Sequence, residues 1–253
     1  MIWVRGVEKS FGDKTVLHGI DAEFHAGQVN FIIGRSGSGK SVLTKCIVGL
    51  LEVDAGSVQY DEVVFSDLDR KEREEVRRRI GMLFQGGALF DSMTVLENVE
   101  FPLRMFAGMD AEERRDRAME CLQRVELEGA EDRFPAEVSG GMQKRVALAR
   151  AIVNRPKYLF CDEPNSGLDP QTAIVIDNLI SDLTHEYGTT TVVISHDMNS
   201  VIEIGENIHF LHEGRVAWQG DRKGILDSGV GDLDNFVYAS DLMRDIRAKL
   251  QGR

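Results

Sequence analysis

The stretch Gly34-Arg35-Ser36-Gly37-Ser38-Gly39-Lys40-Ser41 decides the fold. It matches the pattern GxxxxGK followed by Ser or Thr. The apolar run 28–33 before it is typical of a buried strand, and residues 40–50 after it have helical spacing. Glycines let successive backbone N–H groups point at one anion, and the start of the following helix adds a positive end. The sequence therefore predicts a phosphate-binding loop between a strand and a helix.

Two side chains of this loop predict its chemistry. Lys40 supplies a mobile positive charge for the β- and γ-phosphates of a nucleotide, and Ser41 offers a hydroxyl to Mg²⁺. The alternative is a glycine-rich turn that binds nothing, and the strand and helix on either side make it the weaker interpretation. The residues expected to contact the nucleotide are Gly34, Arg35, Ser36, Gly37, Ser38, Gly39, Lys40, Ser41 and Val42.

Three further candidates follow predicted strands. The apolar run 158–161 ends in Asp162, placed to hold Mg²⁺, and Glu163, which can polarise an attacking water as general base. Gln85 follows the strand-like run 80–84, where its amide could touch Mg²⁺ and the same water. His196 follows the run 191–195, at the level expected for a γ-phosphate contact. Without the phosphate loop, an acidic turn and a lone histidine would be ordinary surface or structural features.

Composition narrows the class of protein. The 253 residues carry a formal net charge of −12, which disfavours nucleic acid as a partner. The three cysteines are scattered, so we expect no disulfides and no zinc site. Because residues 1–10 contain no long apolar stretch, we expect no signal peptide, and because no run of 18 apolar residues occurs, we expect no membrane span.

The order of elements indicates an α/β fold. Short β-like runs dominate the N-terminal part (2–4, 15–17, 28–33 and 57–60), and helical periodicity dominates residues 85–157. Strands and helices then alternate, which favours a mostly parallel sheet with helices on its faces. In the helix 171–187, we expect Ile174, Val175, Leu179, Ile180 and Leu183 to be buried. The block 66–79, of mixed charge, predicts a solvated helix.

A resemblance to the ATP-binding-cassette (ABC) ATPases rests on Ser139-Gly140-Gly141-Met142-Gln143, which opens a predicted helix and looks like the signature motif of that family. The order of motifs along the chain is also the order in that family. The resemblance covers about residues 1–220. It implies a RecA-like P-loop NTPase core with an N-terminal antiparallel β subdomain and an inserted helical subdomain at about 85–157. Beyond the resemblance, we expect a C-terminal helical tail, 221–253.

The resemblance also implies roles for residues. Phe11 would stack on adenine, and Gln85 would lie in the Q-loop. Ser166 to Asp169 would form the D-loop, with Asp169 contacting the nucleotide, and His196 would be the switch histidine. The chain would hydrolyse ATP with Mg²⁺ as a homodimer, and Ser139, Gly140, Gly141 and Met142 would close on the ATP held by the partner. A helix N-terminus with unpaired N–H groups suits that task. Met142 replaces the usual glutamine, Phe11 the more frequent tyrosine, and Asn165 the usual threonine.

Within the family, the SGGM signature and the segments 83–90 and 95–103 look like the ATPase of Mla-type phospholipid transporters. That resemblance implies a permease dimer, an MCE-domain periplasmic protein and a place on the cytoplasmic face of a bacterial inner membrane. Two alternatives stay open. One is the ATPase of another importer, for an amino acid or a metal complex, and the other is a soluble ABC protein outside transport.

The C-terminal part carries one more hypothesis. Leu242, Ile246 and Leu250 form a narrow apolar stripe in a predicted helix, 235–250, after a Gly- and Asp-rich spacer, 227–234. This helix packs on its own core or docks across the dimer.

Overall fold

The computed structural model describes residues 1–239. The chain divides into two compact units. The first contains Met1–His25, Val29–Leu68 and the residues from Ile194 onward, and the second contains Ala26–Gln28 and Asp69–Val193. Among the described residues, no helix has both the length and the apolar content needed to cross a membrane.

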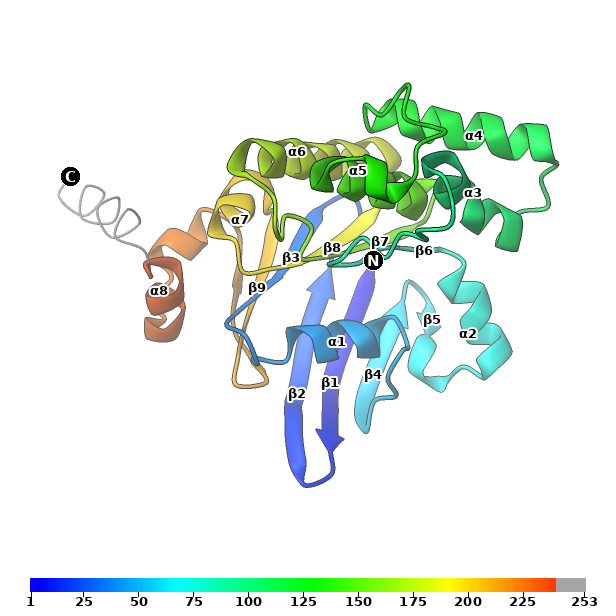
Figure 1. The fold of residues 1–253 in the computed structure, drawn as a ribbon. Coiled ribbons are helices and arrows are strands. Elements are labelled where there is room, and N and C mark those ends of the chain that lie inside the picture. The colour runs from blue at the N-terminus through cyan, green and yellow to red at the C-terminus, as the bar shows by residue number, and fades with distance from the viewer. Residues whose placement is uncertain (240–253) are drawn as a thin grey trace. The chain divides into compact units, whose positions relative to one another are not determined.

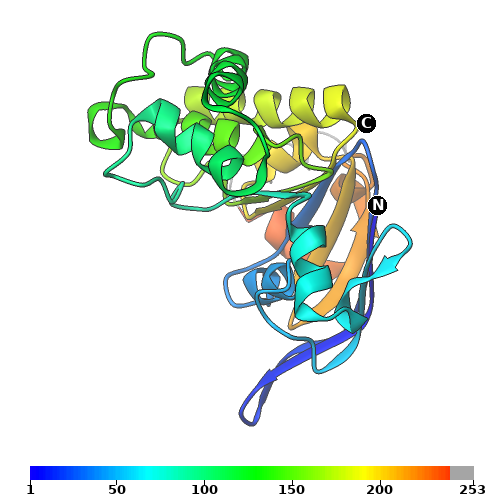
Figure 2. The same ribbon diagram turned by 90° about the vertical axis from the view of Figure 1, so that its right-hand side faces the viewer.

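An antiparallel sheet of four strands forms one part of the first unit. Its order is β2 (Lys14–Phe24), β1 (Ile2–Phe11), β4 (Ala55–Tyr60) and β5 (Val63–Val64). Ile2 pairs with Phe24 on one side and with Tyr60 on the other, and all three are buried. Figure 2 shows β1 and β2 as a long blue two-stranded ribbon. This sheet confirms the predicted antiparallel β subdomain.

The phosphate loop of the first unit is held between a strand and a helix. All five residues of β3 (Val29–Ile33) are buried, as the apolar run predicts, and α1 (Lys40–Ile47) begins where the loop ends. β3 pairs in parallel with β9 (Asn207–His212), which pairs antiparallel with β10 (Arg215–Gly220). Figure 1 shows α1 crossing in front of β1 and β2. The unit also contains η1 (Phe65–Asp67), α7 (Met198–Ile204) and η3 (Gly224–Asp227).

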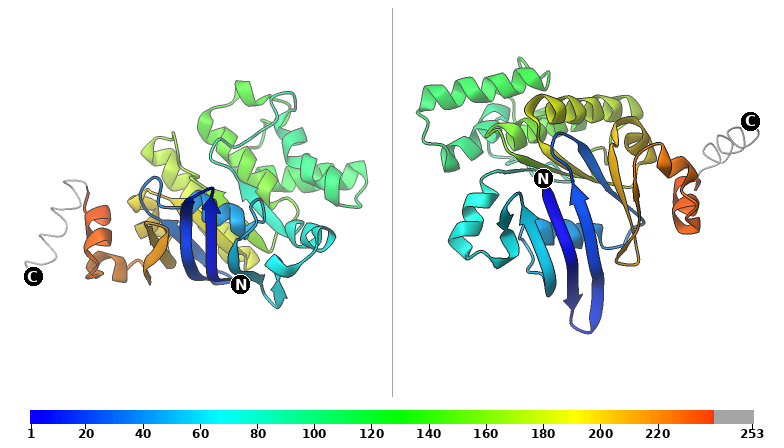
Figure 3. Two further views of the ribbon diagram at one scale, coloured as in Figure 1. Left: turned by 90° about the horizontal axis from the view of Figure 1, so that it is seen from below. Right: turned by 180° about the vertical axis from the view of Figure 1, so that it is seen from behind.

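The second unit combines parallel strands with helices. β6 (Ile80–Leu83) pairs in parallel with β7 (Tyr158–Asp162), and β8 (Thr190–Ser195) lies on the other side of β7. Helices α3 (Val95–Phe106), α4 (Ala111–Arg124) and α5 (Gly140–Ile152) pack on one another and appear green in Figure 3. The other helices are α2 (Arg70–Arg77), η2 (Pro135–Glu137) and α6 (Pro170–Tyr187).

Three helices of the second unit begin with the same local device. An Asp or Thr side chain at the N-cap accepts a hydrogen bond from the backbone N–H three residues later, and the glutamate at that later position accepts one from the N-cap backbone N–H. This explains why the charged block 66–79 is helical only from Arg70. The pairs are Asp69 with Glu72, Thr94 with Glu97, and Asp110 with Glu113.

The predicted buried face of α6 is wrong in part. Ile174 is 54% exposed and Val175 39% exposed, whereas Ile176, Ile180 and Leu183 are buried. The buried face also holds polar residues. Thr184 donates to the carbonyl of Ile180 at 2.6 Å, and Asn165 donates to the Asp177 carboxylate at 2.8 Å. The apolar residues alone therefore predict a buried face that is rotated about the helix axis from the observed one.

The end of the described chain also differs from expectation. The predicted spacer 227–234 contains the last residue of η3 and the first turn of α8 (Gly231–Val237). Leu233 and Val237 are buried at helical spacing, and Ser228 donates to the Asp234 carboxylate at 2.8 Å. These contacts make the segment an ordered part of the first unit. Most of the predicted helix 235–250, with its stripe, lies outside the described residues.

Candidate active site

Three glycines give the phosphate loop its shape. Gly34, Gly37 and Gly39 have φ angles of 149°, 80° and 106°, in the region that side chains rarely adopt. A Cβ on Gly34 would lie 2.3 Å from the carbonyl oxygen of Leu211, and one on Gly39 would lie 2.9 Å from Cδ2 of Leu17. The loop therefore curls against β9 and β2, where only glycine fits.

The polar groups inside this loop suit an anion. Lys40 is 8% exposed, and its Nζ donates to the carbonyls of Gly34 at 2.7 Å and Arg35 at 3.1 Å. The Ser38 hydroxyl is buried and has no hydrogen-bond partner within residues 1–239. Glycine curvature, a buried ammonium and an unsatisfied hydroxyl converge on one small volume, so the loop fits a phosphate group.

Helix α1 presents its N-terminus at the same loop. Its N-cap is Gly39, and no side chain caps the first turn. The first N–H groups of a helix have no partner within the helix and carry its positive end. Ser41, in this first turn, is exposed, and Val42 is half-buried.

Two other predicted contacts belong to the first unit. Phe11 ends β1 and is 48% exposed, with Nζ of Lys9 at 5.7 Å from its ring centre. An exposed aromatic face of this kind can stack on a base. His196 is exposed and directly follows β8, between that strand and the Asp197 N-cap of α7.

The acidic pair belongs to the second unit. The first four residues of β7 are buried, and the strand ends at Asp162. Glu163 follows with a φ of 47°, a left-handed conformation that is uncommon for a residue with a side chain. The strand end thus turns the backbone sharply at the residue predicted to act as general base.

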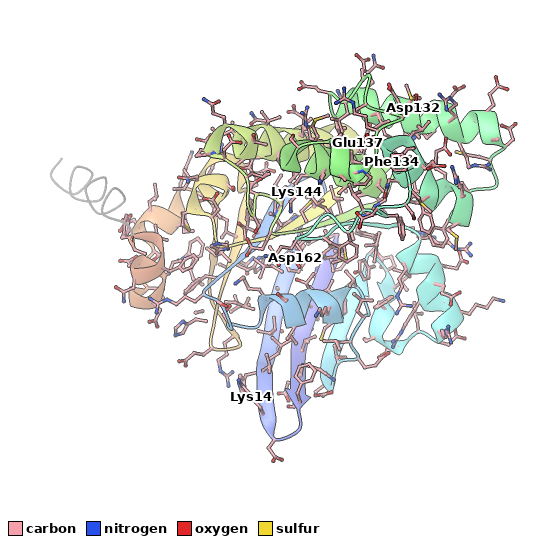
Figure 4. The ribbon with its side chains drawn as sticks, viewed as in Figure 1. Lys14, Asp132, Phe134, Glu137, Lys144 and Asp162 are labelled. Carbon is pink, nitrogen blue, oxygen red and sulfur yellow. The ribbon has the colours of Figure 1, made fainter. Side chains whose placement is uncertain are left out.

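Gln85 and Glu163 are brought together by a residue that sequence reasoning missed. Nζ of Lys144, on α5, donates to the backbone carbonyl of Gln85 and lies 3.4 Å from that of Glu163. Figure 4 labels Lys144 on α5 and Asp162 at the carboxyl end of β7. Burial lowers the pKa of Lys144, and the nearby Asp162 carboxylate opposes that effect. No sequence signal marked Lys144, because a lysine in a helix is typical of a solvent-facing position.

The Ser139 segment forms the start of α5, as predicted. The Ser139 hydroxyl oxygen accepts from the backbone N–H of Met142 at 3.3 Å, so its hydrogen is left to donate elsewhere. Gly140 is exposed. A Cβ on Gly141 would lie 2.5 Å from Cγ2 of Thr172, so α5 approaches α6 closely here.

Asp169 has a local structural role. Its carboxylate caps α6 by accepting from the N–H groups of Gln171 at 3.1 Å and Thr172 at 3.0 Å. It also accepts from the Thr172 hydroxyl at 2.5 Å, and these bonds hold its pKa below the ordinary value. A contact of Asp169 with a nucleotide therefore stays a prediction.

The predicted Mg²⁺ ligands have the right chemistry. Ser41, Gln85 and Asp162 offer a hydroxyl, an amide oxygen and one carboxylate. Mg²⁺ prefers oxygen ligands and is bound through one or two carboxylates together with phosphates and water. Within residues 1–239, no cluster of three or more Asp, Glu, His or Cys forms an all-protein metal site. The donor set therefore fits a cation that arrives with a nucleotide.

Comparisons with known proteins agree with these motifs. A family model described as "ABC transporter" matches residues 17–166, more than half of the chain. The chain is 40% identical over 227 residues to the "Probable ribonucleotide transport ATP-binding protein mkl" of Mycobacterium leprae, covering 90% of this chain and 65% of that protein. It is 36% identical over 243 residues to the "Methionine import ATP-binding protein MetN" of Clostridium tetani, covering 96% and 76%. The chain thus spans about two thirds of the mkl relative.

Solved structures share the fold. The ATP-binding cassette MJ0796, in a dimeric post-hydrolysis state bound to ADP and phosphate, has a TM-score of 0.80 and 37% identity, covering 88% of this chain and 99% of that one. The cbiO1 protein of Clostridium perfringens, part of the ABC transporter complex cbiONQ, has a TM-score of 0.84 and 29% identity, covering 99% and 98%. The fold is therefore that of an ABC ATPase.

Proposed function

Because the chain belongs to the ABC transporter family, we propose that it is the ATP-binding and ATP-hydrolysing subunit of a membrane transporter. The observation that carries this proposal is the phosphate loop. Its glycines leave no room for a Cβ at Gly34 or Gly39, and Lys40 and Ser38 direct polar groups into it.

The residues act on ATP in distinct ways. Lys40 and the loop amides bind the β- and γ-phosphates, and Phe11 stacks on the base. Mg²⁺, held by Ser41, Gln85 and Asp162, neutralises charge that develops on the phosphates. Glu163 takes a proton from the attacking water, so that ATP and water give ADP and phosphate. His196 contacts the γ-phosphate.

The working unit is proposed to be a homodimer. MJ0796, which is similar to 88% of the length of this chain, is dimeric. The start of α5 supports the same arrangement, because Ser139 keeps a hydroxyl hydrogen to donate and the first N–H groups of the helix face outward from an exposed turn. Ser139, Gly140, Gly141 and Met142, with Asp169, would then contact the ATP held by the partner.

An integral membrane permease is the proposed second partner, which would place the chain on the cytoplasmic face of the inner membrane. The second unit contains a groove of about 460 Å³, lined in part by residues of the segments 83–90 and 95–103, and we propose this groove as the permease contact. Its lining is mainly apolar, with four phenylalanines, and includes three arginine side chains. Among the lining residues are Arg77, Phe84, Phe90, Phe101, Phe106 and Arg150.

The cargo separates two candidate functions. The names of the relatives, a methionine importer and a probable ribonucleotide transporter, favour a small-solute importer. A phospholipid transporter of the Mla type, with an MCE-domain partner, is supported only by the SGGM signature and by the segments 83–90 and 95–103. We therefore place the importer first and the lipid transporter second.

Purification of the full chain with its membrane partner tests both levels. We expect a retained polytopic membrane protein and ATP turnover that Lys40→Ala abolishes. Absence of both would contradict a transporter ATPase. In the retained complex, methionine or another small solute that stimulates turnover supports the importer. Co-purified phospholipid with no response to solutes supports the lipid transporter.

A further inference from the structure

Helix α5 holds the segment after β6 by two basic side chains. Lys144 donates to the carbonyl of Gln85, while the Arg150 guanidinium donates to the carbonyls of Gly87 at 2.6 Å and Ala88 at 2.7 Å. Between these anchors, the position of a Cβ on Gly87 would lie 3.7 Å from Cβ of Ala147. The segment 85–88 therefore runs close along α5 and is fixed at both ends.

Only the first of these anchors also reaches the end of β7. Nζ of Lys144 lies 3.4 Å from the carbonyl oxygen of Glu163, so one ammonium group spans two segments that are 78 residues apart in the sequence. An ammonium carries three donors and no acceptor, which suits it to join several carbonyls. The Arg150 guanidinium donates to Gly87 and Ala88, both in the segment after β6.

Burying the Lys144 ammonium costs free energy unless hydrogen bonds or opposite charges offset the loss of hydration. The residue is 6% exposed, and a buried charge must be paired or hydrogen-bonded to be tolerated. The carboxylates of Asp162 and Glu163 and the carbonyls of Gln85 and Glu163 supply that environment. The neighbours of Lys144 along α5, Val146 and Ala147, are buried and apolar, so an uncharged side chain would suffice for packing alone.

We infer that Lys144 is a positioning residue for the proposed ATPase. By binding the backbone of Gln85 and of Glu163 with one ammonium, it fixes the two residues that act on the attacking water relative to each other and to the helix that begins at Ser139. A shift of the Ser139 turn is then transmitted along α5 to both residues. The inference rests on the proposed function, because it assigns Lys144 a role in that same reaction.

The test compares Lys144→Met with Lys144→Arg and with Arg150→Met as the matched control, each in the full chain. Lys144→Met keeps the length of the side chain and removes its donors. We expect kcat to fall by about tenfold or more, because small misplacements of reacting groups have large effects on rate. KM for ATP should stay within about twofold, because the phosphate loop is untouched.

The other variants separate positioning from packing. Lys144→Arg keeps a charged donor and should recover a substantial part of kcat, whereas Arg150→Met should leave kcat closer to the parent than Lys144→Met does. If Lys144→Met lowers the melting temperature, Lys144→Gln, with a neutral donor, replaces it in the comparison. Hydrogen exchange at residues 85–88 and 163–165 should rise together in the Lys144 variants.

The outcomes are distinct. A parent chain without Lys40-dependent turnover contradicts the proposed function itself. An active parent with unchanged kcat in Lys144→Met, or equal losses in Lys144→Met and Arg150→Met, overturns the role of Lys144 and leaves the proposed function standing.

Discussion

The position of a Cβ on Gly34 lies 2.3 Å from the carbonyl oxygen of Leu211, a distance at which no side chain can be accommodated. Leu211 is on β9, the strand beside β3. The first residue of the phosphate loop is therefore pressed against the backbone of the neighbouring strand. The same Cβ would also lie 2.8 Å from the buried Ser38 hydroxyl, so the space inside the loop depends on this glycine.

Gly34→Ala should therefore damage both stability and binding. Forcing a methyl group into a filled site costs about 1–3 kcal/mol. We expect a loss of that size in chemical denaturation and at least about tenfold weaker binding of a fluorescent ATP analogue. Gly37→Ala is the matched control, because Gly37 also has a positive φ but has open space around it. Equal effects of the two variants would show that backbone strain alone, and not the approach to Leu211, decides the outcome.

Lys40→Ala should abolish nucleotide binding without unfolding the chain. The ammonium donates to the loop carbonyls of Gly34 and Arg35, and it is the proposed partner of the phosphates. Isothermal titration with ATP and Mg²⁺ measures the loss. Lys45→Ala removes an exposed lysine from the last turn of the same helix and should bind as the parent does. Binding by Lys40→Ala at parental affinity would refute the assignment of the loop.

Glu163→Gln should separate binding from hydrolysis. The substitution keeps size and the left-handed backbone, so the affinity for ATP should stay within about twofold. Removal of a general base typically lowers the rate by about 10²–10⁴-fold. Turnover is measured by phosphate release, and we expect an ATP-bound dimer to accumulate in sedimentation. Glu128→Gln, at an exposed position, is the charge-matched control. Parental turnover in Glu163→Gln would exclude this carboxylate as the base.

Local patterns predicted the segments that carry the chemistry. The phosphate loop lies between β3 and α1, and the acidic pair lies at the end of β7, because each depends on a short apolar run and its neighbours. β1 and β2 are longer than the runs 2–4 and 15–17. The register of this pair shifts at three points and its glycines Gly6 and Gly19 have positive φ, so the alternation that marks a strand is interrupted.

Contacts between distant segments could not be predicted. A lysine in a helix is typical of a solvent-facing position, so the type of residue at position 144 does not predict its burial. Its partner, the backbone carbonyl of Gln85, is 59 residues away in the sequence, and every residue has such a carbonyl. The capping role of Asp169 was local and recognisable from the proline after it. The exposure of Ile174 could not be predicted from the local sequence, because polar side chains complete the buried face of α6.

Lowering the pH should decrease the free energy of unfolding, because the buried His209 resists protonation. This side chain is buried, and burial lowers its pKa from 6.5 to about 4, with the carbonyl of Phe31 opposing and His25 adding to the shift. Between these values the unfolded chain binds the proton and the folded chain does not, so the free energy of unfolding decreases as pH falls. The contribution lost between pH 7 and pH 5 is about 2 kcal/mol.

Urea unfolding at both pH values measures this slope. His209→Leu should remove about that amount of pH dependence, whatever its effect on stability at pH 7. His185→Leu replaces an exposed histidine and should leave the slope as in the parent. An unchanged slope in His209→Leu would show that the imidazole is protonated as readily in the folded chain as in the unfolded one.

Ser139→Arg should prevent dimer formation while sparing binding by the single chain. The turn at Ser139 is exposed, and in the proposed dimer it closes on the ATP of the partner, where an arginine side chain cannot fit. In a Glu163→Gln background, ATP should drive dimerisation of the parent sequence but not of the Ser139→Arg double variant, as measured by sedimentation. Ser139→Ala is the control, because both substitutions remove the cap to Met142, which costs about 1 kcal/mol, but only arginine adds bulk. An ATP-driven dimer of the arginine variant would mean that this turn lies away from the interface.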